Sequence, residues 1–524
     1  MNSEIMAKTH LLIKRANEKG MLVLLEKGEV VLKVAKAGPV DQELIKVLRE
    51  NKSHIKEYFD SLGASNIVLG SVPVFEINGE KYYQITPVQL YWLDDRLDSE
   101  YKKNDDVHGT GIALFEIEGD IDLVILNKAL YALVNRHESL RSAFELIEGK
   151  FMMRILESSA SGFGLETLDT ADRERADGFL QFLDHTFNMA DGPLFCVRVV
   201  RQPNNRLILA LRIHHVIFDG WSDSIIVRDL MSFYNGFRKG IPSLLPELTF
   251  QIKEHMYMSN VYSEKFRERD RVYWESLYRN PPPHIHIPGS LKKITQVSEK
   301  RVASESFYFT QVIIEKLLFL VGKGGVSLFI VLQATFKSFL FFKTHENDIT
   351  IGTYIHGRSM AGSENLIGCL ASTRVIRTIL DKDDTMFTAV AKVKKANDDM
   401  LFYSAYTLRD LIEGMLPQNH PAGAAFWQFN IQYKDIQIDL PGSNKAGNEQ
   451  SSDFQVKRIP WKTNSLIAID IQIQFYVSQH FLQMEIQYDS SRYTSESINR
   501  LVSDYFSYID KIDFSGKINS PEHI

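Results

Sequence analysis

Ile213-His214-His215-Val216-Ile217-Phe218-Asp219-Gly220-Trp221-Ser222 is the most informative stretch of this 524-residue chain. It follows an apolar run that predicts a β-strand, and it leads into a periodic segment, Ser222 to Arg238, that predicts a helix. Neighbouring side chains on a strand point to opposite faces, so His214 and His215 are not expected to share a role. One imidazole can face a cavity and handle protons near neutral pH, while the other packs inward.

Asp219 lies four residues after His215, in the predicted turn between the strand and the helix. There its carboxylate can orient another side chain or fix the turn through a basic partner. Two adjacent histidines alone also fit a pair of core residues whose hydrogen bonds are satisfied. Nearly every position of the ten-residue run fits one known motif, however, and this match favours a functional site.

An alternation of helical and strand-like segments surrounds this stretch from Tyr82 onward and predicts an α/β fold. The expected helices are 86–97, 122–136, 222–238, one that ends near 279, 325–342, 384–404 and 494–509. The expected strands are 111–117, 194–200, 206–213, 349–354, 426–433, 467–476 and 481–488. The loop Pro242 to Pro246 is expected to divide this body into two halves, 82–245 and 246–524.

The first 61 residues are expected to form a separate small domain. Two runs rich in β-formers flank Lys27-Gly28 and predict a hairpin. Asp41 can cap a helix that carries Leu44 and Leu48 on its apolar side. With a helix before the hairpin and a short one after Asn51, the predicted order is α-β-β-α-α. Residues 62–81 are expected to be a linker, because they hold several glycines and serines and have no sustained period.

The composition excludes several classes of protein. With 60 basic and 66 acidic residues the formal net charge is −6, which does not suit a strongly basic nucleic-acid binder. Two cysteines, Cys196 and Cys369, are too few for a disulfide framework or a multi-cysteine zinc site. Gln333 and Lys337 interrupt the most apolar stretch, 326–342, so it predicts a buried helix. No signal-peptide pattern opens the chain, and we expect a cytoplasmic protein.

From Tyr82 to Phe506 the chain resembles the condensation domain of non-ribosomal peptide synthetases, whose motifs occur here in the expected order. The ten-residue stretch matches the third motif of the family. The other matches are Thr86-Pro-Val-Gln89 with Trp92-Leu93 (first), Asn135-Arg-His-Glu-Ser-Leu-Arg-Ser-Ala-Phe144 (second), Asp348 to Arg358 (fifth) and Ile367 to Thr373 (sixth). His356 and Ser372 depart from the family pattern, and Tyr403 to Leu411 lacks the usual His-Gln-Asp of the seventh motif.

The resemblance implies an α/β (α+β) fold of two chloramphenicol-acetyltransferase-like halves in a V-shaped pseudo-dimer, with a tunnel between them. It implies that His215 lies at the tunnel centre, where it positions the attacking amine and accepts its proton or stabilises the tetrahedral intermediate. His214 is then structural. Asp219 is expected to pair with Arg141 and hold the loop, because an Asp beside an Arg stays ionised and is a poor base. Gly220 is expected to let the backbone approach the thioester carbonyl, with its N–H near the oxyanion.

Trp221, Ser222 and Arg358 are expected to support this site. The Trp221-Ser222 pair is typical of condensing rather than epimerising members of the family. His214 argues against the cyclising variant, in which an Asp replaces the first His. Plant-type acyl-CoA transferases share the His-x-x-x-Asp pattern, but their Asp-Phe-Gly-Trp motif is missing from this sequence.

Residues 1–61 resemble the N-terminal docking domain of some synthetase subunits. This implies that the C-terminal tail of an upstream subunit adds as a strand beside the edge strand Glu29 to Ala35. Lys27, Lys33 and Lys36 would then contact acidic residues of that tail, although lysines also protect edge strands from aggregation. Exposed ion pairs contribute about 0–1 kcal/mol each, so the docking is expected to be weak and sensitive to salt.

The length leaves no room for an adenylation domain beside the condensation domain, so the acceptor is expected from outside the chain. Gly324-Gly325-Val326-Ser327 matches a carrier-site pattern, but it opens a helix that the fold needs and is interpreted as a coincidence. The acceptor is therefore a free amine, which releases the peptide as an amide, or an aminoacyl group on a carrier protein in trans. The layout resembles the terminal subunit of rhabdopeptide- and xenortide-type synthetases, which favours a free amine. A non-catalytic docking and recruitment module is the third alternative, against which the intact His pair argues.

No bound cofactor and no metal is expected. The substrate is expected as a 4′-phosphopantetheine thioester on a partner carrier protein. The expected partners are an upstream synthetase subunit, through its docking tail and carrier domain, and a small amine. Neither a nucleic acid nor a membrane is expected as a partner, and we expect a monomer.

Overall fold

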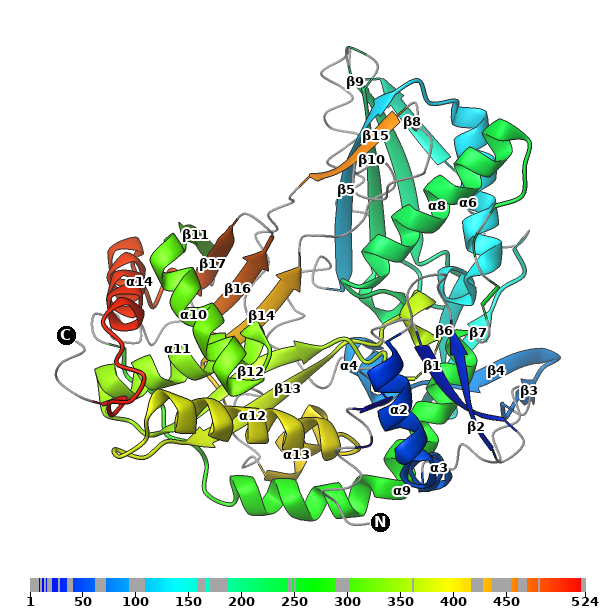
Figure 1. Cartoon of the computed structure of the whole chain (residues 1–524). Helices are drawn as coiled ribbons and strands as arrows, with labels where there is room; N and C mark the ends of the chain where they lie inside the picture. The colour runs from blue at the N-terminus through cyan, green and yellow to red at the C-terminus, as the bar shows by residue number, and fades with distance from the viewer. Residues whose placement is uncertain are drawn as a thin grey trace.

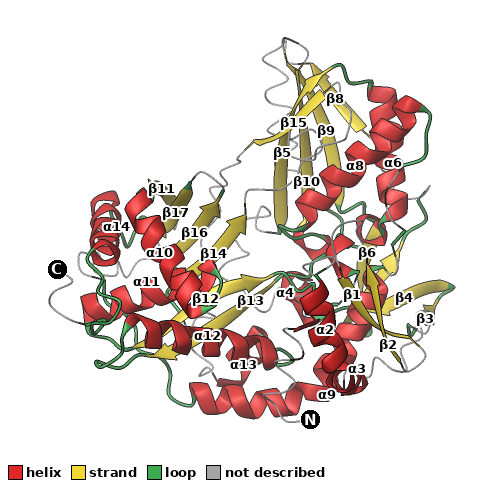
Figure 2. Ribbon diagram, viewed as in Figure 1, coloured by secondary structure: helices red, strands yellow, loops and turns green. Residues whose placement is uncertain are grey.

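The motif strand, β10 (Arg206–His214), is the middle strand of a five-stranded sheet in the computed structural model of the chain. It pairs antiparallel with β5 (Thr110–Gly119) and β9 (Phe195–Gln202). Two helices, α6 (Leu123–Arg136) and α8 (Ser222–Lys239), cover one face of this sheet (Figure 2) and share its apolar core. The predicted strand-to-helix setting of the motif is thereby confirmed.

The structure describes most of the chain, with gaps. The described residues are 9, 12–13, 16, 21–26, 29–34, 41–61, 72–93, 109–158, 165–169, 187–202, 204, 206–243, 245, 247–248, 251–287, 302–360, 362–415, 427–435, 454–459, 469–478 and 481–519.

A second sheet and its helices form the other half. Its six strands in spatial order are β11 (Val302–Tyr308), β17 (Leu482–Asp489), β16 (Ile471–Val477), β14 (Phe429–Asp435), β12 (Asp348–Ile355) and β13 (Ser372–Ile379). Its helices are α10 (Gln311–Gly324), α11 (Leu328–Thr344), α12 (Met386–Phe402), α13 (Leu408–Met415) and α14 (Ser495–Asp510). Strand β14 pairs in parallel with both β12 and β16, and the other pairs of this sheet are antiparallel. This half has a large apolar core of its own.

Smaller elements complete the first half. They are α4 (Pro87–Leu93), the 3₁₀ turns η3 (Glu138–Arg141) and η4 (His215–Ile217), strand β8 (Leu165–Asp169), which pairs in parallel with β9, and the sheet of β3 (Phe75–Ile77), β4 (Glu80–Gln84), β7 (Lys150–Ile155) and β6 (Ser142–Ile147). A further 3₁₀ turn, η5 (Ser363–Asn365), lies between β12 and β13 in the second half.

The long helix α9 (Ile252–Tyr278) joins the two halves and runs along the base of the molecule (Figure 1). Near its start, Ile252 and Met256 are buried in the first core. Near its end, Trp274 and Tyr278 are buried in the second core. One continuous helix therefore fixes the distance and angle between the two cores.

Strand β15 (Phe454–Ile459) crosses between the halves. It follows β14 in the sequence, yet it pairs antiparallel with β5 at the edge of the first sheet, as Figure 1 shows. Leu366, Ile367 and Leu370 also lie in the first core. The expected division at residue 245 is therefore not a division between cores, because segments from beyond 245 complete the first one.

Helix α11 confirms the prediction of a buried apolar helix. Gln333 and Lys337 are both buried, and the Lys337 ammonium donates hydrogen bonds to the Ile376 carbonyl and the Thr378 hydroxyl, each at 2.8 Å. Burial lowers the pKa of Lys337 well below its usual value. Within the described ranges no single helix has the length and hydropathy of a membrane span; α10 and α11 reach them only as a pair, with a bend of 111° between them.

The N-terminal unit has a small core of its own, which includes Met21, Val23, Leu44, Leu48 and Ile55. The predicted hairpin is confirmed as β1 (Met21–Glu26) and β2 (Glu29–Val34). The predicted cap is confirmed as well, because the carboxylate of Asp41 accepts a hydrogen bond from the Leu44 N–H at 3.0 Å. Two helices follow, α2 (Gln42–Glu50) and α3 (Lys52–Ser61).

Candidate active site

His214 ends strand β10 and caps the turn that follows. Its main-chain N–H donates to the Leu194 carbonyl at 2.9 Å, as a strand residue does. Its ring atom Nδ1 accepts a hydrogen bond from the Val216 N–H at 3.1 Å. A Cβ atom added at Gly109 would lie 2.6 Å from Nε2 of this ring, so the imidazole fits closely against that backbone. These contacts agree with the structural role expected of His214.

His215 opens the 3₁₀ turn η4 and is partly buried. Its main-chain N–H donates to the Gly109 carbonyl at 2.7 Å, and its ring hydrogen-bonds the main chain of Phe218. Burial lowers the pKa of His215 below its usual value, and this effect outweighs the Phe218 hydrogen bond and the charge of Asp219, which both raise it. The imidazole is therefore uncharged at neutral pH and can accept a proton.

Asp219 is buried and accepts hydrogen bonds from both halves of the molecule. Arg358 donates to it through both terminal nitrogens, at 2.8 and 2.9 Å. The main-chain N–H groups of Leu370 and Ala371 add bonds of 3.1 and 3.0 Å. On its own side, Ser222 donates through its N–H at 3.1 Å and its hydroxyl at 2.8 Å. A carboxylate held in this way is a structural anchor, and its lone pairs are occupied.

The expected pair of Asp219 and Arg141 is wrong. Arg141 lies in η3, and its Nη1 donates to the Leu156 carbonyl at 2.8 Å. The partner of Asp219 is Arg358, whose side chain is only 1% exposed. The prediction that a basic residue fixes the turn is confirmed, but the quoted motifs contain three arginines, Arg136, Arg141 and Arg358. The partner is selected by the fold, because the segment after β12 packs against the motif turn and places Arg358 on Asp219.

Gly357 makes the Arg358 contact sterically feasible. Its φ is +65°, and a Cβ atom there would lie 2.0 Å from the Leu370 carbonyl oxygen. Both conditions require glycine. The close approach brings the 357–371 segment under the motif turn, where Arg358 also donates to the carbonyls of His356 at 2.9 Å and Leu366 at 3.0 Å.

Ser222 is fully buried and joins the same junction. Its hydroxyl accepts from the Gly368 N–H at 3.2 Å and from Arg358 at 3.3 Å while it donates to Asp219. Ser139 makes a parallel contact, donating to the Ile367 carbonyl at 2.5 Å. The motif turn of the first half and the 366–371 segment of the second half are thus held together by buried polar bonds.

Trp221 covers this junction. It is 44% exposed, and its indole N–H donates to the Glu364 carbonyl at 3.1 Å. Its ring lies 5.2 Å from the ring of His356 and 5.7 Å from the guanidinium carbon of Arg358. The support predicted for Trp221 is therefore a cover over the buried Asp219–Arg358 pair.

Gly220 is exposed, and a Cβ atom built on it would meet no heavy atom within 4 Å. The space beside this glycine is therefore open. A group can therefore approach the main chain of Gly220 from that side.

Three contacts of the site were not predicted. Trp92 of α4 stacks on His215, with ring centroids 4.7 Å apart and planes at 23°. His255 of α9 is buried against the Gly357 carbonyl at 3.2 Å. Asp229 of α8 binds Arg136 and His137, both at 2.9 Å. Trp92 and His137 stand inside the family motifs, and their place there could have marked them as site residues. His255 and Asp229 stand outside these motifs, and nothing in a single sequence marks them.

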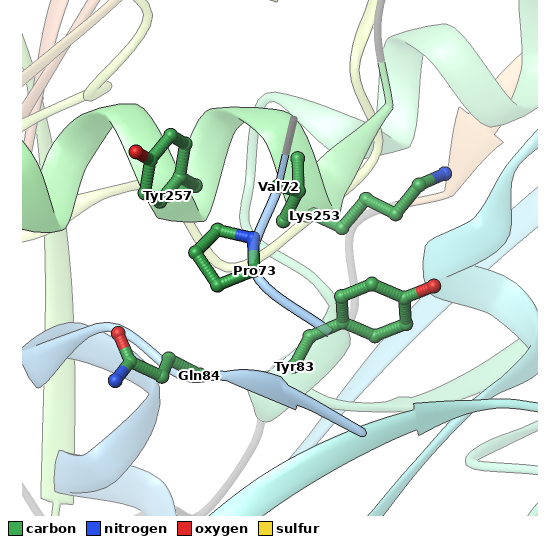
Figure 3. Close-up of a pocket in the computed structure, with 6 residues that line it drawn as sticks. All are labelled: Val72, Pro73, Tyr83, Gln84, Lys253 and Tyr257. Atoms are coloured by element: carbon green, nitrogen blue, oxygen red, sulfur yellow. The ribbon is translucent and has the colours of Figure 1, made fainter. Parts of the chain in front are cut away.

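The three lysines expected to contact a docking tail cannot be placed. Lys27, Lys36 and the side chain of Lys33 lie outside the described residues. A recess of about 210 Å³ (Figure 3) is lined by Val72, Pro73, Tyr83, Gln84, Lys253 and Tyr257. It contains none of the predicted site residues, and we assign it no part in the chemistry. Among the described residues no three His, Cys, Asp or Glu side chains gather as a metal site would require.

A family model described as "Condensation domain" matches residues 80–513. Among curated relatives, gramicidin S synthase 2 of Brevibacillus brevis is 26% identical over 450 residues, which cover 83% of this chain and 9% of that protein. Surfactin synthase subunit 2 of Bacillus subtilis (strain 168) is 23% identical over 476 residues, which cover 90% of this chain and 12% of that protein. The chain therefore spans only a small part of the length of these relatives.

Solved structures share the fold. The X-domain from teicoplanin biosynthesis superposes with a TM-score of 0.69 at 16% identity, covering 83% of this chain and 96% of that one. The first condensation domain of the calcium-dependent antibiotic synthetase superposes with a TM-score of 0.63 at 17% identity, covering 84% of this chain and 98% of that one. The expected two-half α/β fold is confirmed.

Proposed function

The chain belongs to the condensation-domain family of non-ribosomal peptide synthetases, and on that premise we propose that it forms an amide bond between a carrier-bound peptidyl thioester and an amine. The observation that carries this proposal is the setting of His215. It is an uncharged, partly buried imidazole on a turn that Arg358 and Asp219 fix from both halves.

The reaction needs an amine nitrogen to attack the thioester carbonyl carbon. A C–N bond forms, the C–S bond breaks, one proton leaves the nitrogen, and the phosphopantetheine sulfur leaves as a thiol after protonation. His215 is suited to hold the attacking amine or to accept its proton, because a neutral imidazole has a free lone pair. The open side of Gly220 offers room for the carbonyl near a main-chain N–H.

Asp219 and Arg358 serve the reaction indirectly. The carboxylate already accepts bonds from the guanidinium and from the main-chain N–H groups of Leu370 and Ala371. A group so engaged is a poor base. Its contribution is to fix the turn that carries His215, since a misplacement of about 1 Å can lower a rate by about 100-fold.

The acceptor is proposed to be a free amine, so that the reaction releases the peptide as an amide. The string Gly324 to Ser327 supports this indirectly. Gly325 is the left-handed C-cap of α10, and the Ser327 hydroxyl caps α11 by accepting from the Ile330 N–H at 3.4 Å. The Ser327 hydroxyl is thus used to cap a helix, which argues against this string as a carrier attachment site.

Residues 1–61 are proposed to dock the upstream subunit. Three observations support this: the unit has a small core of its own, its described residues form a two-stranded sheet, and helices α2 and α3 follow that sheet in the sequence. Among the described residues, β1 and β2 pair with each other and with no third strand, so an added strand could extend this sheet at an outer edge.

The proposed function is tested by product analysis. The purified chain is mixed with a peptidyl thioester, either on a carrier protein or as a pantetheine thioester, and with a panel of amines that includes 2-phenylethylamine, n-hexylamine and an aminoacyl carrier protein. Mass spectrometry then identifies the peptide product. The proposal expects a peptide amide with at least one free amine and its loss in His215→Ala.

The outcomes separate the alternatives. Product that forms only on the aminoacyl carrier would favour condensation in trans. A thioester that stays intact with every acceptor, while the carrier protein still binds, would favour the non-catalytic recruitment module.

A further inference from the structure

Helix α4 places Trp92 directly on the imidazole of His215. The ring centroids are 4.7 Å apart and the planes are inclined by 23°, which is a stacked arrangement. The same helix is attached to the motif turn through Gln89, which is buried and donates to the Val216 carbonyl at 3.4 Å. Gln89 also accepts from the Thr86 N–H at 3.1 Å, which closes the start of the helix. The indole is therefore held over the turn by its own helix.

The rest of the imidazole is surrounded closely. Its hydrogen bond to the main chain of Phe218 engages one ring nitrogen. The Phe218 ring lies 6.1 Å away at 36°. A Cβ atom at Gly111 would come within 3.5 Å of Cε1 of His215 and within 3.0 Å of Phe218, so little spare volume exists there. One nitrogen is thus fixed by Phe218, and the plane of the ring is fixed by Trp92.

Trp92 also reaches the second half. The buried thiol of Cys369 is hydrogen-bonded to Trp92, and burial raises the pKa of that thiol. Cys369 directly precedes Leu370 and Ala371, whose N–H groups bind Asp219. One indole therefore contacts both the imidazole and the segment that holds the Asp219 anchor.

We propose that Trp92 is the positioning residue of His215: the indole holds the imidazole plane so that the nitrogen not bonded to Phe218 faces the attacking amine. This inference rests on the proposed function. Trp92 acts through His215 and does not itself take part in bond making. Without the indole, the ring can rotate about its Cβ–Cγ bond and water can reach it, and both changes lower the fraction of productive encounters.

The inference is tested with Trp92→Leu, which removes the stack, and Trp92→Phe, which keeps an aromatic plate. Tyr91→Leu is the control, because Tyr91 is on the same helix, is 46% exposed and meets Trp92 edge-on at 5.2 Å. Steady-state kcat, KM for the amine, the pH profile of kcat and the thermal midpoint are measured for each variant. Should Trp92→Leu fail to fold, Trp92→Met takes its place.

Trp92→Leu is expected to lower kcat by about 100-fold, the effect of misplacing a catalytic group by about 1 Å, with KM changed by less than about threefold. The acid limb of its pH profile of kcat should move to higher pH, because hydration brings the His215 pKa back toward its ordinary value. Asp219 is the charged group that acts on this ring, and every variant retains it. Trp92→Phe should recover most of kcat and the wild-type pH profile. Tyr91→Leu should keep the wild-type kcat within about twofold.

Two results would overturn the inference. In the first, kcat of Trp92→Leu equals that of the Tyr91→Leu control. In the second, Trp92→Phe and Trp92→Leu lose kcat equally and the pH profile does not move. An inactive wild type would instead contradict the proposed function. In that event NMR tests whether Trp92 positions His215. The His215 ring resonance is assigned by its loss in His215→Gln. A stacked imidazole must change both its shift and its titration in Trp92→Leu, and an unchanged signal rejects the stack.

Discussion

Asp219 is buried in the motif turn and is paired with Arg358 from the second half. Its role as a turn anchor followed from a carboxylate four residues after a histidine in a strand-to-helix turn. Its partner did not, because Arg141 and Arg358 both stand in recognised motifs. The choice depends on a contact 139 positions away in sequence, and on Gly357, whose positive φ lets β12 deliver the guanidinium.

Substitution of the two arginines distinguishes their roles. Arg358→Gln leaves a buried carboxylate without its charge partner, so we expect a loss of about 3–5 kcal/mol in the free energy of unfolding. Arg141→Gln, the matched control, removes a bond to one carbonyl and should cost about 1–2 kcal/mol. Urea denaturation of both variants provides the measurement. Equal losses would mean that Asp219 does not depend on Arg358.

His255 predicts a pH dependence of stability. Burial is the main cause of the fall in its pKa to about 4, with a further lowering effect from Arg358, whereas the Gly357 carbonyl and Asp219 raise the pKa. The unfolded chain, with a His pKa of about 6.5, takes up the proton first as the pH falls, so stability declines between about pH 6.5 and 4. At pH 5 this one residue should cost about 2 kcal/mol relative to pH 7.

The variant His255→Gln isolates that contribution, because its amide can still donate to the Gly357 carbonyl. We expect its unfolding free energy to fall by about 2 kcal/mol less than that of the wild type between pH 7 and pH 5. Parallel curves for the two proteins would show that His255 does not titrate in this window.

At the scale of elements, periodic segments were predictable and crossing segments were not. The helix expected at 122–136 is α6 at Leu123–Arg136, and the strand expected at 206–213 is β10 at Arg206–His214. Their apolar residues recur on one face, and that face packs against the core of the first half. Strand β15 was missed, because Phe-Gln-Val-Lys-Arg-Ile is short and its alternation is broken at Lys457-Arg458, and its partner β5 lies more than 300 residues earlier. Helix α10 was also missed, although it is long and apolar.

The crossing of β15 predicts a specific effect of substitution. Val456 pairs with Ile117 of β5 and packs on the first core, whereas Lys457 is exposed. Val456→Ser should cost about 1 kcal/mol through lost apolar burial, and Lys457→Ser less than about 0.5 kcal/mol. Hydrogen exchange measured by mass spectrometry should then accelerate in β5 for Val456→Ser. Acceleration confined to β14 and β16 would contradict the assignment of β15 to the first sheet.

At the scale of the whole molecule, the described residues connect the two halves at several places. Helix α9 spans both cores, β15 crosses into the first sheet, and the Asp219–Arg358 pair joins the motif turn to the second half. The family resemblance predicted two halves, but not these connections. They make the position of His215, and so the geometry of the candidate site, depend on both halves.

The N-terminal unit carries a prediction about substrate delivery. If Lys27, Lys33 and Lys36 contact an acidic tail, replacing all three by Glu should raise KM for a carrier-bound substrate by about tenfold or more, since three exposed ion pairs contribute up to about 1 kcal/mol each and become repulsive. The KM for a pantetheine thioester, which needs no docking, should not change. Both values are measured at low and high salt. Equal effects on the two substrates would place the lysines outside the docking surface.

The central claim is that His215, set on a turn fixed from both halves, makes this chain an amide-forming enzyme. The most direct measurement is the rate of peptide-amide formation from a peptidyl pantetheine thioester and a free amine by the wild type and by His215→Ala. General acid–base groups contribute about 10²–10⁴-fold, so we predict a fall of at least about 100-fold in His215→Ala. Amide formation by His215→Ala at the wild-type rate would contradict the claim.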